Sequence, residues 1–417
     1  MKKVSRRRGK LKGNLKELER EAAVICQEFA VFCTYVTENH VKLSKKTGNI
    51  GKKDCFALNG LFHAREEYEK PVYIQNKYPV ICFFYYAAVR YKILEFNPSG
   101  SELQQGRNYQ CFWEATVWEQ YILLLTLFLS DGAFARKESY WYPDNIAELW
   151  GLYIDRFMEW AAVNKAHVGM KYQWSRESLF LYGESLDFLA RCLEAFGLIK
   201  NCRMPVRGDV QENSWEIEVC PLLETVNDLY ENTETEELED SEELPGSKKD
   251  IEIQCAYMAY MDRIMQGKTA GNLSGIFGEE DVQYKNQRID LQVSMRYIDC
   301  IRVIRMNLED SLYDLHMAIQ RAVSFDNDHL FSFTVGRGMM KRLYTLPEAI
   351  NRDTECTVDI CLGELELRKG QTFTYLFDYG DHWQFDIKVM EIREGTVERP
   401  EVIKAVGDAP EQYPYCE

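Results

Sequence analysis

Two carboxylates flank a tight turn near the C-terminal end of the sequence. Asp378 and Asp381 stand on either side of Tyr379-Gly380, just before Trp383. Similar side chains occur in residues 312–329, so the candidate ligand or metal residues are His316, Asp326, Asp328, His329, Asp378 and Asp381. Carboxylates and imidazoles that converge from a loop and a turn could bind a divalent ion, and Mg²⁺ or Mn²⁺ could hydrolyse a phosphodiester there.

The spacing of these residues matches no metal motif, and each residue also has a structural explanation. Aspartates in turns accept backbone N–H groups, and His316 beside Leu315 could hydrogen-bond a neighbouring strand. The sequence contains no Walker loop, no Gly-x-Ser-x-Gly elbow and no helical pair of histidines. We therefore assign no catalytic residue, predict no cofactor and favour a non-enzymatic protein, with a divalent metal at the carboxylates as the alternative.

A β-hairpin is predicted to position the turn. Phe385, Ile387 and Val389 alternate with polar residues, a period of two that buries one face of a strand. Gly380 stands at the bend, where a residue without a Cβ can adopt positive φ. The hairpin thus holds Asp378 and Asp381 at its tip.

The residues before the hairpin predict an α+β domain. Residues 300–306 alternate like a strand, and Asp310 or Ser311 can cap a helix that follows. Leu312, Leu315, Ile319 and Ala322 mark the buried face of this helix. A second strand is predicted over residues 329–335, whereas residues 357–367 fit either a strand or a helix.

Four sequence blocks in this region resemble the plasmid pRiA4b ORF-3-like family. They are residues 312–322, 325–333, 375–383 and 399–414, and the motif residues are Leu315, His316, Asp328, His329, Asp378, Gly380, Asp381 and Trp383. The resemblance implies an α+β domain found in bacterial, plasmid and insertion-element proteins, with no established activity. The chain departs from the family at Phe385, where many members have histidine, and at Val402 and Ala409, in a region where many have cysteines.

The N-terminal half is predicted to be mainly helical. Helices are expected over residues 15–38, 78–95, 114–129 and 185–196. The last of these is followed by Gly-Leu-Ile, a predicted two-stranded wing and another helix, an order that resembles a winged-helix module. Residues 91–96 resemble a diverged copy of the Gly-Leu-Ile segment that follows this helix. Because the helix at 185–196 offers only Arg191 among acidic neighbours, we expect it to pack or to mediate dimerisation rather than to contact DNA.

The predicted fold is multidomain, a mainly α, winged-helix-like N-terminal region followed by an α+β C-terminal domain. The predicted segments are a basic arm (1–20), a helical, tandem winged-helix-like region (21–230), an acidic linker (231–250), a connecting helix and loop (251–286) and the pRiA4b ORF-3-like domain (287–417). At 417 residues, the chain is long enough for two or three such domains.

Charge and cysteine content limit the classes of partner. The net charge of −16 opposes general adhesion to nucleic acid or anionic membranes, but local basic segments act over about 8–10 Å. Candidate contacts to DNA or RNA phosphates are Arg6, Arg7, Arg8, Lys42, Lys45, Lys46, Lys52 and Lys53. A solvated basic tail is the alternative for residues 1–20. The thirteen cysteines include no Cys-x-x-Cys pair, which favours reduced thiols.

The cysteine content and the short apolar runs predict a cytoplasmic protein with no membrane span, and the family resemblance implies a bacterial one. The predicted function is a non-enzymatic, nucleic-acid-associated or protein-interaction module linked to mobile elements. The alternative function is a metal-dependent hydrolase or nuclease that uses the carboxylates of the 378–381 turn.

Overall fold

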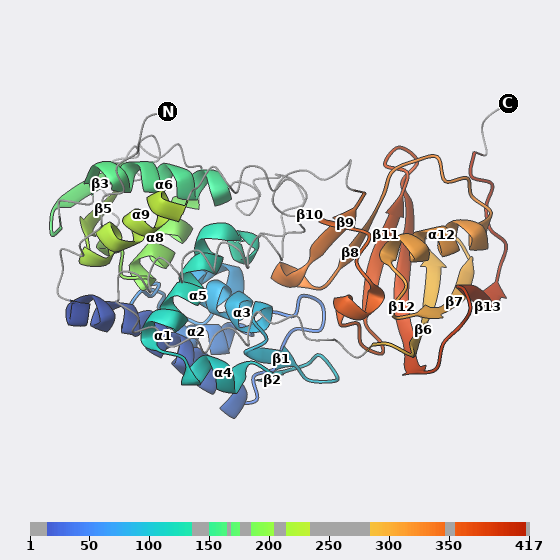
Figure 1. Ribbon diagram of the computed structural model, residues 1–417, viewed down its shortest axis with the longest axis horizontal. Coiled ribbons are helices and arrows are strands. Elements are labelled where there is room, and N and C mark those ends of the chain that lie inside the picture. The colour runs from blue at the N-terminus through green and yellow to red at the C-terminus, as the bar shows by residue number, and fades with distance from the viewer. Residues whose placement is uncertain are drawn as a thin grey trace, which may run out of the picture. The chain divides into compact units, whose positions relative to one another are not determined.

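The chain forms two compact units, residues Met1–Gly278 and Glu279–Glu417. The computed structural model describes residues 15–135, 150–164, 168–175, 185–203, 214–233, 284–346 and 355–413. Figure 1 shows helices throughout the first unit and a large sheet in the second. The prediction of a multidomain chain with an α-rich N-terminal half and an α+β C-terminal part is thereby confirmed. The basic arm up to residue 14, the acidic linker beyond residue 233 and residues 251–283 lie outside the described residues.

The N-terminal unit is built from helices around two small sheets. The described helices are α1 (Leu15–Glu38), α2 (Lys52–Asn59), α3 (Pro79–Arg90), α4 (Tyr109–Glu114), α5 (Val117–Ser130), α6 (Trp150–Asn164), α8 (Ser185–Ala195) and α9 (Pro221–Thr233). Strands β1 (Leu94–Phe96) and β2 (Leu103–Gln105) form one antiparallel pair. Strands β3 (Lys171–Ser175), β4 (Ile199–Arg203) and β5 (Ser214–Val219) form a sheet of order β3-β5-β4.

Helix α3 is the centre of the aromatic core in this unit. Every residue from Pro79 to Val89 is buried, because apolar side chains cover all sides of the helix. Phe84 meets Phe29 of α1 edge-to-face at 5.4 Å, and Phe83 meets Phe196, just after α8, at 5.3 Å. Helices α3 and α8 therefore pack directly against each other.

Two predicted helices have different ends in the structure. The helix expected over 78–95 ends at Arg90, since Lys92 adopts a left-handed φ of 54° and the chain continues as β1. The helix expected from residue 114 begins at Val117, because Thr116 and Glu119 form a capping box around its first turn. Both α3 and α5 are buried over most of their length and form part of the core. None of the described helices is long and apolar enough to cross a membrane.

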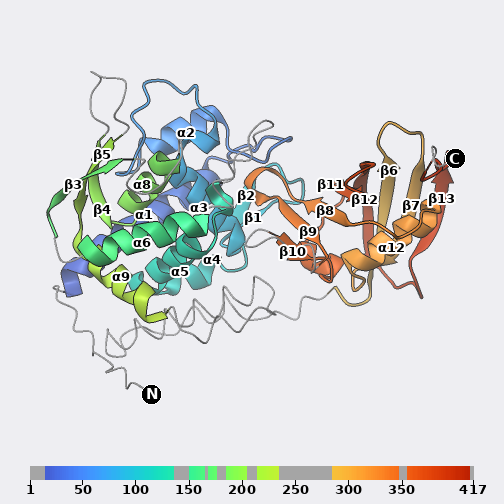
Figure 2. The same ribbon diagram turned by 90° about the horizontal axis from the view of Figure 1, so that it is seen from above.

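The C-terminal unit is an eight-stranded sheet with one long helix on one face (Figure 2). The strand order is β10-β9-β8-β11-β12-β6-β7-β13, antiparallel except between β10 and β9. The strands are β6 (Gln287–Met295), β7 (Ile301–Asn307), β8 (Phe331–Val335), β9 (Arg342–Thr345), β10 (Glu355–Thr357), β11 (Thr372–Phe377), β12 (Trp383–Glu394) and β13 (Glu401–Val406). Helix α12 (Leu312–Val323) buries Leu312, Leu315 and Ile319 in the core that it shares with the sheet.

Local sequence features explain the ends of α12. Ser311, not Asp310, is the N-cap, because its hydroxyl accepts from the backbone N–H of Asp314 while the Asp314 carboxylate accepts from Ser311. Asp310 instead accepts the backbone N–H of Asn307. The segment at 357–367, which the sequence left open, combines the end of β10 with a 3-10 turn at Leu362–Leu365.

A histidine connects three parts of the N-terminal unit. His63 Nδ1 lies 2.9 Å from Oε1 of Glu28 in α1, and its Nε2 lies 3.2 Å from the carbonyl oxygen of Glu194 in α8. Both partners are acceptors, so both ring nitrogens donate and the ring is an imidazolium. Burial alone would lower the pKa of His63, but the hydrogen bond and charge of Glu28 outweigh it and raise the pKa.

We expect this contact to make the N-terminal unit less stable as the pH rises. A raised histidine pKa contributes its full stabilisation below the unfolded value of about 6.5 and loses it as the pH passes through the higher folded value. His63→Ala should lower the free energy of unfolding by about 1 kcal/mol at pH 6 and by less at pH 8.5. The measurement is urea unfolding followed by tryptophan fluorescence, since Trp383 alone of eight tryptophans lies beyond residue 278. Equal losses of unfolding free energy at both pH values would contradict a charged hydrogen bond between His63 and Glu28.

Candidate functional site

The turn between β11 and β12 is shaped by its aspartate rather than by its glycine. The strands pair up to Phe377↔Trp383. Positive φ values occur at Asp378 (56°) and His382 (63°), whereas Gly380 is not among the residues with positive φ. The predicted conformation of Gly380 is therefore wrong. An aspartate tolerates the left-handed region because its short side chain can bond the backbone locally.

The carboxylate of Asp378 is used inside the turn. Its Oδ1 accepts the backbone N–H groups of Gly380 at 2.8 Å and Asp381 at 3.3 Å, and the residue is only 6% exposed. Its Oδ2 lies 3.5 Å from Nε2 of His329. The backbone N–H of Asp378 donates to the carbonyl of Leu330, so the turn is tied to the loop before β8. Asp381 and His382 are exposed.

His316 is a buried, neutral histidine in the interior of the domain. Its ring stacks on Phe331 with centroids 3.6 Å apart. Nε2 lies 2.7 Å from Oδ1 of Asn327, and Nδ1 lies 2.7 Å from the hydroxyl of Tyr375. Because Asn327 Oδ1 only accepts, Nε2 carries the proton and Nδ1 accepts from Tyr375. Burial lowers the pKa of His316 to about 4, against a smaller opposing effect of Asn327.

The remaining candidate aspartates anchor the C-terminal tail. Asp328 accepts the hydroxyl of Tyr413 at 2.6 Å and the amide of Gln412 at 3.1 Å. The hydrogen bond from Tyr413 holds the pKa of Asp328 below its usual value. The backbone N–H of Asp326 donates to Oε1 of Gln412 at 2.6 Å. The block at 399–414 thus contributes contacts that hold the 326–329 loop.

The structure brings part of the predicted constellation together. His329 lies near both Asp378 and Asp328, at 3.5 and 3.9 Å. His316, in contrast, has both nitrogens engaged by Tyr375 and Asn327. Among the described residues, no group of three or more histidine, cysteine, aspartate or glutamate side chains is arranged to hold a metal ion. The arrangement is one of hydrogen bonds that hold the helix, the loop and the hairpin together.

Sequence reasoning missed Tyr375, Gln320 and Gln412. The Tyr375 hydroxyl also accepts from Nε2 of Gln320 at 2.7 Å. A signal for Tyr375 exists, because it lies on the same face of its strand as Phe373 and Phe377, and a buried hydroxyl needs partners. No local pattern indicates Gln412, whose partners lie 84–86 positions earlier in the chain.

The candidate nucleic-acid contacts of the N-terminal unit lie in one short folded segment. Lys42, Lys45, Lys46, Lys52 and Lys53 are all exposed. Leu43 and Ile50 form an antiparallel bridge that brings the two ends of this segment together. Lys42 also pairs with Glu102, while its side chain remains 73% exposed. Arg6, Arg7 and Arg8 lie outside the described residues.

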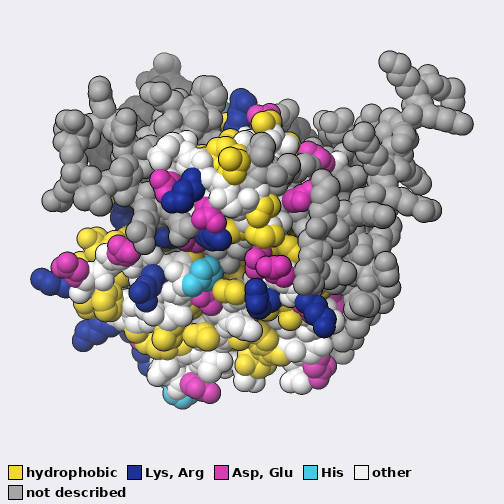
Figure 3. Space-filling view, turned by 90° about the vertical axis from the view of Figure 1, so that its left-hand side faces the viewer, with side chains coloured by type: hydrophobic (Ala, Val, Ile, Leu, Met, Phe, Trp, Pro, Cys, Tyr) yellow, Lys and Arg dark blue, Asp and Glu magenta, His cyan; other side chains and the backbone are white. Residues whose placement is uncertain are grey.

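Other parts of the N-terminal surface carry balanced charge. Figure 3 shows the end of this unit that lies at the left of Figure 1, where basic and acidic side chains are interspersed. Two such pairs cross the β3-β5-β4 sheet, Lys171–Glu216 at 2.6 Å and Lys200–Glu218 at 2.8 Å. Arg191 of α8 pairs with Glu66 and Glu194. The predicted packing role of α8 is confirmed.

The C-terminal unit is thus an α+β domain whose motif residues bind one another. Residues 286–412 match the family described as plasmid pRiA4b ORF-3-like protein, which confirms the resemblance for this part of the chain. A solved structure, a protein of unknown function (MM3350) from Methanosarcina mazei Go1, is 23% identical over 30% of this chain and 72% of its own, with a TM-score of 0.26. No curated protein matches the chain.

We expect His316 to stay neutral well below the usual histidine range. Its depressed pKa of about 4 means that stability is lost as the pH falls from about 6.5, where the unfolded histidine takes up a proton, towards 4. In ¹⁵N-imidazole spectra of the full chain, His316 should keep the Nε2–H tautomer at pH 5.5. Titration of this ring near pH 6.5 would contradict the buried hydrogen-bonded state.

Asp378 and Asp381 should differ in their effect on stability. Asp378→Ala removes the acceptor of two backbone N–H groups and should cost about 1–3 kcal/mol. Asp381→Ala removes an exposed carboxylate and should cost less than about 0.5 kcal/mol. Thermal unfolding of the C-terminal unit, followed by near-ultraviolet circular dichroism, separates the two. A metal site would instead make both substitutions abolish any Mg²⁺- or Mn²⁺-induced rise in Tm.

Proposed function

We propose that this chain is a non-catalytic binding protein, and that its N-terminal unit contacts nucleic-acid phosphates. In the C-terminal unit, Asp378 binds its own turn, Asp328 binds Tyr413 and His316 binds Tyr375. Two of the four predicted carboxylates, Asp378 and Asp328, thus have structural partners. The alternative of a metal-dependent hydrolase at the 378–381 turn therefore has less support.

The exposed lysine segment is the observation that carries the proposal. Lys52 and Lys53 occupy the first turn of α2, where the helix dipole disfavours cations. Lys45 and Lys46 lie on the bridged loop that precedes this helix. Since Lys52 and Lys53 do not stabilise the helix that carries them, we infer that a phosphate-bearing partner accounts for this exposed lysine cluster. Membership of plasmid or insertion-element systems is part of the proposal and is supported by the family resemblance.

The winged-helix interpretation of the N-terminal unit is also part of this proposal. Helix, strand, helix and hairpin follow in the order α6, β3, α8 and β4-β5, an order that fits such a module. In winged-helix DNA binders, the helix before the wing enters the major groove. Here α8 packs against α3, which is buried along its length. We therefore propose phosphate contacts by the lysine segment, with little sequence preference.

The test is fluorescence anisotropy of the full chain with short duplex DNA and RNA at two salt concentrations. Replacing Lys45, Lys46, Lys52 and Lys53 with glutamine should weaken binding and reduce the slope of log K against log salt by about 0.9 per lost phosphate contact. The matched control replaces four exposed lysines of the C-terminal unit, Lys285, Lys369, Lys388 and Lys404, with glutamine.

The control variant loses the same charge at another place, so it should bind with nearly the same affinity as the unmodified chain. Equal weakening by both variants would indicate a general charge effect and would contradict the assigned segment. If the unmodified chain binds neither duplex at low salt, the nucleic-acid proposal is wrong.

A further inference from the structure

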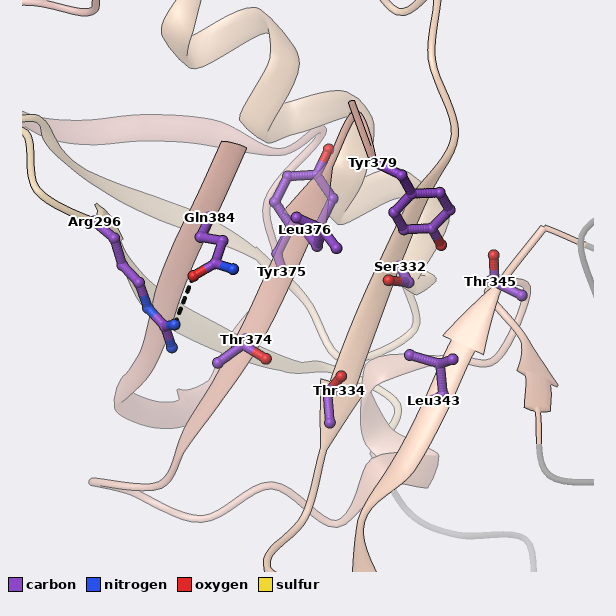
Figure 4. Close-up of a pocket in the computed structure, with 10 residues that line it drawn as sticks. All are labelled: Arg296, Ser332, Thr334, Leu343, Thr345, Thr374, Tyr375, Leu376, Tyr379 and Gln384. Carbon is purple, nitrogen blue, oxygen red and sulfur yellow. Dashed lines mark hydrogen bonds between the residues drawn. The ribbon is translucent and has the colours of Figure 1, made fainter. Parts of the chain in front are cut away.

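The open face of the C-terminal sheet carries a pocket of about 530 Å³ (Figure 4). This volume is within the range of roughly 300–1,000 Å³ typical of small-molecule sites. Strands β9, β8, β11 and β12 contribute most of its lining, together with Tyr379 from the turn and Arg296 after β6. All lining residues belong to the C-terminal unit, and neither the proposed phosphate contacts nor the 326–329 loop takes part.

Strand alternation creates a wall of hydroxyl groups in this pocket. On β8 and β11, Phe331, Phe333 and Tyr375 face the core, so the residues between them face outward. The outward positions carry the hydroxyls of Ser332, Thr334 and Thr374, and Thr345 adds another from β9. The pairing register places Ser332 opposite Thr345 and Thr334 opposite Thr374, so the four hydroxyls form two adjacent rows.

The deepest hydroxyls are almost inaccessible to solvent. Ser332 is 5% exposed and Thr345 is 1% exposed. Thr345 Oγ1 donates to the carbonyl of Phe331 at 3.0 Å, which leaves its lone pairs as acceptors. Ser332, Thr334 and Thr374 carry hydroxyls that can both donate and accept, so the pocket is suited to a hydrogen-bonding ligand.

The amide of Gln384 has a defined orientation at one end of the pocket. Arg296 Nη1 donates to Oε1 of Gln384 at 2.7 Å, as the dashed line in Figure 4 marks. Since arginine only donates, the carbonyl must face Arg296, and the NH₂ group is left as a donor on the pocket side. Figure 4 shows this nitrogen directed away from Arg296, towards Leu376.

The charges at this end of the pocket neutralise each other. Arg296 donates through Nη2 and Nε to Oδ1 of Asp386, at 2.7 and 3.1 Å. Among the described residues of the lining, Arg296 alone is charged, and its guanidinium has a carboxylate and an amide as partners. A charged ligand would therefore meet no unbalanced charge among the described residues of the lining. The pocket therefore favours a neutral ligand.

We propose that this pocket binds a neutral, hydroxyl-rich ligand, namely an uncharged sugar, either free or at the end of a glycan. Sugar hydroxyls both donate and accept, as do the serine and threonine hydroxyls of the two rows. The ring of Tyr379, 47% exposed beside these rows, offers an apolar surface for the C–H face of a pyranose. Leu343 and Leu376 supply further apolar contact.

The test measures binding of glucose, galactose, mannose and N-acetylglucosamine to the full chain by saturation-transfer NMR, with affinities from titration. Thr374→Val keeps the shape of the side chain but removes its hydroxyl, and should weaken binding about 3–10-fold. Gln384→Met removes the oriented donor and should have a similar effect. Thr372→Val is the control, because Thr372 lies on the same strand and face but outside the pocket.

Three outcomes would overturn the proposal. One is that none of the four sugars binds at millimolar concentration, either as the free sugar or as its methyl glycoside. Another is that Thr374→Val binds the sugar as well as Thr372→Val does. The third is that glucose 6-phosphate or adenosine monophosphate binds more tightly than every neutral sugar. Saturation transfer to the methyl glycoside of one of these sugars, but not to the free sugar, would support the proposal. It would identify the ligand as the terminal sugar of a glycan rather than a free sugar.

Discussion

The hydroxyl of Tyr375 is the contact on which the C-terminal unit depends. It donates to His316 and accepts from Gln320, both on α12, while its own strand β11 runs through the sheet between β8 and β12. One buried oxygen thus connects the helix to the sheet. Since a buried donor or acceptor without a partner costs about 1–3 kcal/mol, this trio fixes both the rotation and the height of α12 on the sheet.

The same strands serve two purposes through their alternation. Inward residues of β8 and β11 are aromatic, and Phe331 also forms the stacking surface for His316. Outward residues of the same strands are serine and threonine, which line the pocket. A shift of one residue in register would exchange the two sets, placing hydroxyls in the core and aromatic rings in water. The core and the pocket are therefore specified by one pairing pattern.

In the N-terminal unit, helix packing buries part of α8, the helix that would contact DNA in a winged-helix protein. Helix α3 is buried on all sides and packs against α8, whose Arg191 is held by Glu66 and Glu194. The charges across the β3-β5-β4 sheet are paired as well. Lys52 and Lys53 differ, because they stand in the first turn of α2, where the helix dipole disfavours cations.

Helices and strands that depend on residues close together in the chain could be predicted from the sequence. The amphipathic pattern of α8, the capping box of α12 and the alternation in β12 could all be predicted, because each depends on residues within a few positions. The family of the C-terminal unit was also recognisable from four blocks. Which polar residues hydrogen-bond to the motif residues became clear only from the tertiary structure. His316 and Tyr375 are 59 positions apart, and Asp328 and Tyr413 are 85 apart. No local pattern indicates hydrogen bonds between residues so distant in the chain, and in the folded domain these bonds give the polar groups a structural role.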